Sequence, residues 1–292
     1  MNDEQKRTLW SPLPHLRWVD GRHTQNPSKS EHCLANSQVT EWSSFEKDVL
    51  QKMKELGTPP NNFTPSQPHE YFIVGNETGL QGRLIEHLAQ SMGPMFDSLK
   101  LGISLADFHV GQTIDQTIAE RAEKASKGKE PAKQHTEDEE QKGGGYNVPD
   151  FVLLRDDVYT FCVMFEVKTF LDVRAQQEPI GGTVPHCQIR YVSLWGKHPD
   201  EKLTFVGQLA RYMDDARCRF GALTTHEKMW FVRRASPDTF AVSNGIFAGQ
   251  TATSEVPSLR QCLLYISWLA SDKKGAFSPG VFGDKLVSNI GR

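Results

Sequence analysis

Apolar residues recur with two different periods along the chain, and these periods predict its helices and strands. Spacings of three and four residues are typical of helices with one buried face, and they predict helices at 41–56, about 77–92, 203–217 and 259–269. Short runs rich in β-branched and aromatic residues predict strands at 71–74, 150–154, 158–168, 220–225 and 229–233, and an edge strand at 240–247. From the second helix onward, the order of these elements predicts a mixed α/β fold.

Two stretches depart from this pattern. Residues 1–40 are rich in Ser, Asn, His and Pro, and we expect them to form an irregular N-terminal arm. Residues from about 116 to 145 are charged and end in three glycines, which predicts a mobile insertion. The segments on either side of this insertion are each too small to hold a core of their own, so residues 41–292 are expected to form a single domain.

The charge balance and the cysteines of the chain limit which binding partners and which cellular compartment we expect. The chain has 33 Lys and Arg against 36 Asp and Glu, and its net charge of −3 provides no overall attraction to a polyanion. This balance argues against nucleic-acid binding unless basic residues gather locally. The five cysteines include no CxxC pair and no apolar leader opens the chain, so we expect an intracellular protein, nuclear or cytoplasmic. The apolar run at 262–270 is too short to cross a bilayer, so no membrane partner is expected.

The predicted strand at 158–168 has one wholly apolar face and one face that mixes apolar with polar residues. Alternate side chains of a strand share a face, so the odd-numbered positions form an apolar face, while Glu166 and Lys168 emerge together at the end of the other face. Asp150 opens the preceding strand. A hairpin with its turn near 155–157 would return Asp150 alongside the end of this half-buried strand, close to Glu166.

Asp150, Glu166 and Lys168 are residue types suited to metal-assisted phosphoryl chemistry. Neighbouring carboxylates repel one another and are stable together where a cation joins them. A small number of hard oxygen ligands suits Mg²⁺ or Mn²⁺, and such an ion can activate a water and stabilise charge on a phosphoryl oxygen. The structural alternative is a solvated Glu-Lys pair at the end of a strand, preceded by a Pro-Asp turn.

The order of these residues resembles the signature of the PD-(D/E)XK nuclease superfamily. The dipeptide Pro-Asp at 149–150 precedes Glu-Val-Lys at 166–168 on the next strand. In the helix that follows, Gln208 and Tyr212 are one turn apart and are similar to the QxxxY motif of the RecB-like branch. The resemblance covers about 76–234, and the run also looks like the stand-alone or kinase-fused restriction-endonuclease-like domains of fungi. It implies the restriction endonuclease-like fold, a mixed sheet flanked by helices.

The resemblance also implies a role for each of these side chains. Asp150 and Glu166 would bind Mg²⁺ or Mn²⁺ together with the main-chain carbonyl of Val167. Lys168 would position the attacking water, and the QxxxY pair would support the site or contact the nucleic acid. Either a phosphate-binding surface or ordinary solvated charge would account for five arginines, Arg211, Arg217, Arg219, Arg233 and Arg234.

The superfamily places a further glutamate on the first core helix, and this chain offers Glu77 and Glu86. The buried face of that helix is predicted by four apolar residues, Leu80, Leu84, Leu88 and Met92. At about 100° per residue, Glu77 falls on this face and Glu86 falls opposite it. We therefore expect Glu77 to contribute to metal or water binding, although the spacing from Gly82 to Glu86 superficially resembles the RecB-like pattern. The structural alternative for Glu77 is a favourable interaction with the helix N-terminus.

Together these features predict a metal-dependent nuclease that hydrolyses phosphodiester bonds in DNA, with RNA as the second substrate. A homodimer agrees with the resemblance, because many nucleases of this type pair to cut both strands. The alternative is a catalytically silent restriction-endonuclease-like module that binds nucleic acid or a protein partner, which the near-neutral charge favours. A different metal-using phosphoryl or nucleotide enzyme is also consistent with the sequence.

Overall fold

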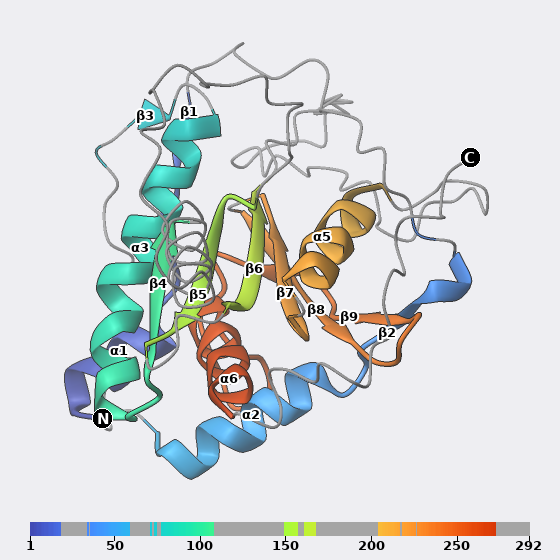
Figure 1. Cartoon of the computed structure of the whole chain (residues 1–292). Helices are drawn as coiled ribbons and strands as arrows, with labels where there is room; N and C mark the ends of the chain where they lie inside the picture. The colour runs from blue at the N-terminus through green and yellow to red at the C-terminus, as the bar shows by residue number, and fades with distance from the viewer. Residues whose placement is uncertain are drawn as a thin grey trace, which may run out of the picture.

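A computed structural model describes residues 1–18, 34, 36–58, 71, 73–74, 77–107, 149–156, 161–167, 204–216, 218–225 and 227–272 (Figure 1). Within these ranges the chain forms an α/β structure, in which a mixed sheet of eight strands is flanked by helices. This architecture confirms the fold class that the sequence predicts. The insertion at 116–145, predicted to be mobile, lies outside the described residues.

The sheet combines antiparallel neighbours with two parallel pairs. Seven strands follow one another across it in the order β2 (Val39–Glu41), β9 (Phe240–Val242), β8 (Lys228–Arg234), β7 (Phe220–Thr224), β6 (Phe161–Val167), β5 (Phe151–Arg155) and β4 (Ile103–Asp107). The eighth strand, β10 (Ile246–Phe247), also pairs with β8. The parallel pairs are β6 with β7 and β2 with β9. A parallel pair needs a crossover connection, and the helix α5 (Thr204–Asp215) lies within the one that joins β6 to β7.

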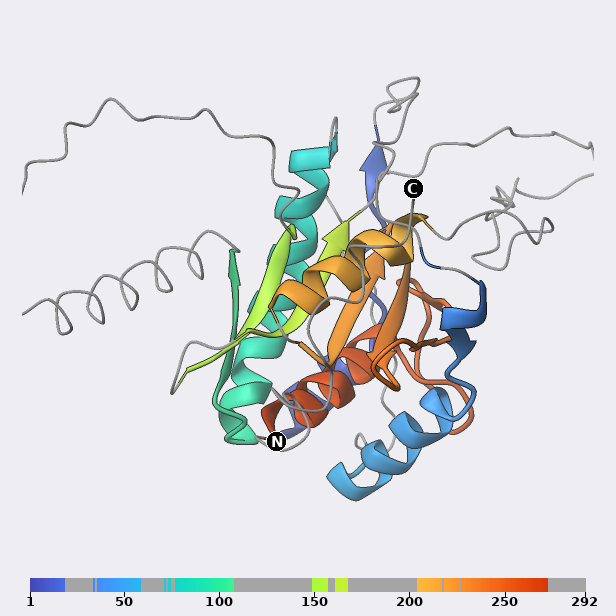
Figure 2. The same cartoon turned by 45° about the vertical axis from the view of Figure 1, so that its right-hand side comes forward.

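Helices cover both faces of this sheet (Figures 1 and 2). On one face, α5 packs against alternate residues of β5, β6 and β7, including Val152, Met164 and Leu223. On the other face, the intervening residues pack with side chains of α2 (Phe45–Leu56), α3 (Glu77–Ser98) and α6 (Leu259–Ser271). Because successive side chains of a strand point to opposite faces, the two apolar clusters lie on opposite sides of the sheet.

The N-terminal residues are more ordered than their composition indicates. The expectation of an irregular arm over residues 1–40 is wrong for residues 3–10, which form α1 (Asp3–Trp10). Asn2 caps this helix through a capping box with Gln5, and Leu9 is fully buried in the core. Arg260 of α6 donates hydrogen bonds to main-chain carbonyls just beyond α1, those of Ser11 and Pro12, and so fastens this segment to the core. Further along, β1 (Arg17–Trp18) pairs in parallel with β3 (Ile73–Val74), and a 3₁₀ turn (Asn36–Gln38) leads into β2.

Two other boundaries differ from the expectation because distant residues set them. The second helix extends to Ser98, past Pro94, because Met95 and Phe96 are buried in the core. The segment at 240–247 forms two strands: β9 is not an edge, because β2 pairs with its outer side, whereas β10 pairs with β8 alone among the described strands, as an edge strand does. Both outcomes depend on contacts with segments far away in the sequence, which local patterns do not record.

Candidate functional site

Asp150 and Glu166 come from neighbouring strands at one end of the sheet. Strands β5 and β6 pair antiparallel with Phe151 opposite Phe165, and the main-chain N–H of Asp150 donates to the carbonyl of Phe165 at 3.0 Å. Position 150 therefore lies beside the end of β6, next to position 166. This pairing confirms the register predicted from the sequence.

The carboxylate of Asp150 is held by two neutral donors. Its Oδ1 accepts a hydrogen bond from Nε2 of Gln81, on α3, and its Oδ2 accepts one from the main-chain N–H of Val167 at 2.5 Å. The side chain of Asp150 thus joins α3 to the end of β6. A carboxylate offers about four lone-pair positions, so accepting two hydrogen bonds does not prevent it from binding a cation.

Gln81 is a site residue that the sequence patterns did not reveal. It lies one helical turn after Glu77, next to Leu80, whose side chain is fully buried. The four-residue spacing between Glu77 and Gln81 was the available signal, because residues one turn apart share a helix face. The backbone of Glu77 begins α3, but its side chain lies outside the described part of the structure.

Glu86 points away from this site, as expected. It forms an ion pair with Arg83, and its side chain is 43% exposed. The four residues expected on the opposite face are all fully buried: Leu80, Leu84, Leu88 and Met92. The predicted orientation of α3 is therefore confirmed.

Glu166 lies on the face of the sheet that α5 covers. It is opposite Leu223 of β7, which in turn is opposite Trp230 of β8, and both neighbours belong to the apolar cluster beneath α5. The expectation of a half-buried strand is wrong here, since Glu166 is only 3% exposed. Helices cover both faces of β6, so a polar residue on the face toward α5 is also shielded from water.

An irregularity in β6 shifts the alternation at its other end. The pairing between β5 and β6 changes register next to Leu153, and Phe161 is opposite Leu154. As a result, Phe161 packs on the α5 face while Cys162 joins the opposite cluster. Strict alternation predicts the reverse, with Phe161 on the face away from α5 and Cys162 on the α5 face. The prediction fails because a bulge reverses the faces of the residues that precede it.

Gln208 and Tyr212 face the sheet from α5 and are joined by a hydrogen bond. Nε2 of Gln208 donates to the hydroxyl of Tyr212 at 2.7 Å, and each residue is 5% exposed. The expectation that the two side chains point the same way is confirmed. Oε1 of Gln208 is buried and has no hydrogen-bond partner among the residues that the structure describes. A buried amide oxygen of this kind is available to a donor from a ligand or a water.

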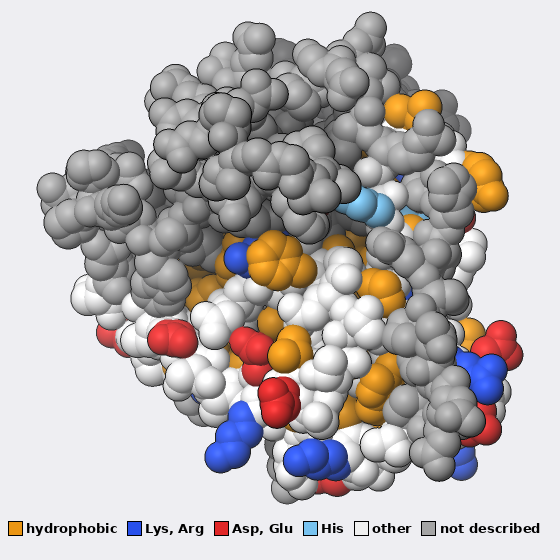
Figure 3. Space-filling model, turned by 180° about the vertical axis from the view of Figure 1, so that it is seen from behind, with side chains coloured by type: hydrophobic (Ala, Val, Ile, Leu, Met, Phe, Trp, Pro, Cys, Tyr) orange, Lys and Arg blue, Asp and Glu red, His pale blue; other side chains and the backbone are white. Residues whose placement is uncertain are grey.

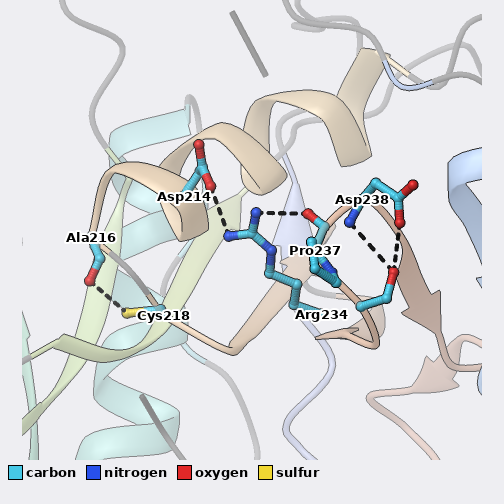
Figure 4. A network of polar contacts seen from close by, with 7 residues as sticks. Asp214, Ala216, Cys218, Arg234, Pro237 and Asp238 are labelled. Atoms are coloured by element: carbon cyan, nitrogen blue, oxygen red, sulfur yellow. Dashed lines mark hydrogen bonds and ion pairs between the residues drawn. The ribbon is translucent and has the colours of Figure 1, made fainter. Parts of the chain in front are cut away.

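Arg233 and Arg234, two of the five arginines considered for a phosphate-binding surface, lie at the end of the sheet away from Asp150 and Glu166. Arg234 is 2% exposed, and its guanidinium donates to Oδ1 of Asp214 at 2.7 Å and to the carbonyl of Pro237 at 2.9 Å (Figure 4). The guanidinium of Arg233 lies 4.4 Å from the ring centroid of Trp42, and burial, followed by the charge of Arg219, lowers its pKa. Arg234 is thus neither solvated nor placed to bind a phosphate.

The described residues include oxygen donors of the kind that bind a metal, but these donors do not form a large cluster of metal-binding side chains. The described residues contain no group of three or more His, Cys, Asp and Glu residues that could hold a metal ion. Mg²⁺ is commonly bound by one or two carboxylates and keeps several waters, so Asp150, Glu166 and the carbonyl of Val167 supply the kinds of donor that such an ion takes. Lys168, the predicted water-positioning residue, lies outside the described residues.

A cysteine nucleophile is not favoured among the described residues. Cys162, Cys218 and Cys262 are buried and carry free thiols. Burial raises the pKa of the Cys218 and Cys262 thiols, so both favour the unreactive protonated form.

Comparisons with models of known families, with curated proteins and with solved structures gave no match for this chain. Within the described ranges, no helix combines the length and the apolar character that crossing a membrane requires. Seen from behind, the described surface carries acidic and basic side chains interspersed with hydrophobic ones, with no basic patch dominating (Figure 3).

Proposed function

We propose that this protein is a metal-dependent nuclease of the PD-(D/E)XK type, with a restriction endonuclease-like fold, and that it hydrolyses phosphodiester bonds in DNA, with RNA as the second substrate. One observation carries the proposal. Asp150 and Glu166 lie next to each other at the end of two antiparallel strands, and the crossover from the second of these strands carries the buried Gln208–Tyr212 pair on the same face as Glu166.

In the proposed site each residue has a distinct task. Asp150 and Glu166 would hold Mg²⁺ or Mn²⁺ with the carbonyl of Val167, and such an ion would supply Lewis-acid stabilisation of the phosphoryl oxygens. Gln81 and the N–H of Val167 orient the Asp150 carboxylate. Lys168 positions the attacking water, and Glu77 contributes to metal or water binding.

The buried pair on α5 supports the neighbouring carboxylate. The hydrogen bond between Gln208 and Tyr212 fixes both side chains against the sheet, so the amide of Gln208 cannot turn freely. Burial of Glu166 in this surrounding also excludes bulk water, which strengthens the interaction of its charge with a cation.

The test is DNA cleavage in Mg²⁺ by the wild-type chain and by Glu166→Gln, Lys168→Ala and Glu86→Gln. Glu86 is the matched control, because it is an exposed glutamate that points away from the site. We expect the first two variants to lose more than about 100-fold in rate, since metal binding and water positioning each stabilise the transition state by several kcal/mol. If Glu166→Gln and Lys168→Ala fold and cut at the wild-type rate, the nuclease assignment is wrong.

A catalytically silent module of the same fold is the second candidate, and one observation favours it. Both oxygens of Asp150 already accept hydrogen bonds from the chain itself, as they would if this carboxylate only joined α3 to β6. Calorimetric titration with Mg²⁺ and Mn²⁺ separates the two functions. A silent module binds neither ion, whereas the nuclease binds at least one of them, and Glu166→Gln removes that binding.

A further inference from the structure

Lys228 and Phe247 form an aromatic and cationic pair at the same end of the sheet as Asp150 and Glu166. Phe247 of β10 is directly opposite Lys228 of β8, so the two side chains share a face. Nζ of Lys228 lies 4.6 Å from the ring centroid of Phe247 and 5.4 Å from that of Trp230. Phe247 is nevertheless 44% exposed, which is unusual for a phenylalanine in a sheet.

The backbone beside this pair leaves room for the lysine stem. A Cβ added at Gly245 would collide with the side chain of Lys228 and would lie 2.7 Å from Nε1 of Trp230. Glycine at this position therefore lets the aliphatic part of Lys228 lie along the chain while its ammonium group reaches over the two rings. Burial lowers the pKa of Lys228, which indicates that part of its hydration has been replaced by this packing.

The pair lies on the same face of the sheet as Glu166. Glu166, Leu223 and Trp230 form one row across three adjacent strands, and Lys228 belongs to the same face as Trp230, two residues nearer the end where β6 and β7 finish. Strands are about 4.8 Å apart, so β8 and β10, two and three strands away from β6, place Lys228 and Phe247 about 10 and 14 Å from Glu166 across the sheet.

We propose that Lys228 and Phe247 form a binding platform for an unpaired stretch of the substrate, in which a nucleobase stacks on the exposed ring and its phosphate contacts the ammonium group. The proposal rests on the proposed nuclease function for its substrate class, and it makes single-stranded or frayed DNA the preferred substrate. Every base has a π face that stacks on an aromatic ring, so this contact does not depend on base sequence. A base paired within a duplex has no free face, except at an end.

The chain contains a matched control for this platform. Nζ of Lys52 lies 3.8 Å from the ring centroid of Trp268, which is 40% exposed. That pair joins α2 and α6, whose side chains pack on the opposite face of the sheet from Glu166. The two pairs have the same chemistry, and only the Lys228–Phe247 pair lies beside the candidate site.

The experiment measures binding of fluorescent oligothymidylate and of a duplex of equal length, in EDTA so that no cleavage takes place. We expect Phe247→Leu to weaken binding of the single strand about tenfold and Trp268→Leu to leave it unchanged. Phe247→Trp keeps a stacking ring and should retain the affinity. Lys228→Gln should lower the slope of log affinity against log salt concentration by about 0.7, whereas Lys52→Gln should not change it.

Equal binding by the wild-type chain, Phe247→Leu and Trp268→Leu overturns this inference, as does a preference for the duplex. Cleavage assays in Mg²⁺ separate this failure from failure of the proposed function. If the wild-type chain cuts DNA and Phe247→Leu binds the single strand normally, the nuclease function stands and the platform is ruled out. A chain that never cuts but still depends on Phe247 for single-strand binding keeps the platform as part of a silent module. Melting temperatures within about 2 °C of wild type establish that each variant is folded.

Discussion

The two ends of the sheet hold charge in opposite ways. At one end, the guanidinium of Arg234 is buried against a carboxylate of opposite sign, that of Asp214 (Figure 4). At the other end, the fold places two residues of like charge, Asp150 and Glu166, next to each other. Opposite charges of a buried pair stabilise each other, whereas a buried carboxylate such as that of Glu166 raises the free energy of the folded state unless donors or a cation offset its loss of hydration.

This difference suggests that one end of the sheet stabilises the fold and that the other end binds a ligand. The Arg234–Asp214 pair requires nothing from outside the chain. Gln81 and the main-chain N–H of Val167 donate to Asp150, and both of these donors are neutral. The first end is therefore expected to determine stability and the second to determine ligand binding, and four predictions test that division.

The largest effect is expected at the structural end. Arg234→Leu leaves the carboxylate of Asp214, itself only 12% exposed, without its ion pair, and should lower the free energy of unfolding by about 3–5 kcal/mol. Urea unfolding followed by circular dichroism measures this loss. The double variant with Asp214→Leu should recover part of it, because no uncompensated charge remains. A single variant as stable as wild type would mean that the pair contributes nothing.

Metal ions should act only at the other end. At a hundred times its dissociation constant, Mg²⁺ should stabilise the wild-type chain by about 2.7 kcal/mol, because it binds the folded state alone. Thermal unfolding with and without the ion measures the shift. Glu166→Gln should remove the shift while Asp214→Asn retains it. A shift that survives Glu166→Gln would place the ion elsewhere.

The support of Asp150 by Gln81 should affect metal affinity more than folding. Gln81→Leu removes the donor to Oδ1 and should weaken Mg²⁺ binding about 10–100-fold, which is typical of a lost partner of a metal ligand. Calorimetric titration provides the dissociation constant, and Gln81→Glu tests whether a charged neighbour is tolerated. Glu86→Gln, on the exposed face of the same helix, is the control. Unchanged affinity in Gln81→Leu would limit Gln81 to a structural role.

The smallest effect is expected on α5. Tyr212→Phe removes the hydroxyl that accepts the hydrogen bond from Gln208 and should lower the free energy of unfolding by about 1 kcal/mol, the usual net value of one hydrogen bond. The same change at Tyr71, which is 80% exposed, should cost less, because water replaces the contacts of an exposed hydroxyl. Chemical denaturation of both variants provides the comparison. Equal stability of the two variants would show that the buried pair does not stabilise the helix against the sheet.

Much of the central part of the site was predictable because it depends on local pattern. The alternation of β5 and β6 and the short hairpin between them predict that Asp150 and Glu166 are neighbours, and the register confirms it. The helical spacing of Gln208 and Tyr212 predicts their common direction, which their hydrogen bond confirms. In each case the relevant partners are close in sequence, so one period decides the geometry.

Burial was predicted wrongly because it depends on what covers an element. Alternation presents Glu166 at the end of a half-buried strand, but α5 covers that face and leaves the residue 3% exposed. The same limit applies to residues 3–10, whose polar composition hides a helix that packs into the core. The period of a segment shows which residues share a face, and it contains no information on whether another element lies over that face.

The amino-acid sequence by itself determined the kind and order of the main elements, the pairing of β5 with β6 and the direction of the polar residues on α3 and α5. Only the tertiary structure decided that Gln81 donates to Asp150, that Glu166 is buried, that β9 is an inner strand, and that Arg234 binds Asp214. The physical reason is the range of the interactions. Backbone geometry and side-chain periodicity act over a few residues, whereas burial and charge pairing depend on segments that the chain brings together from far apart.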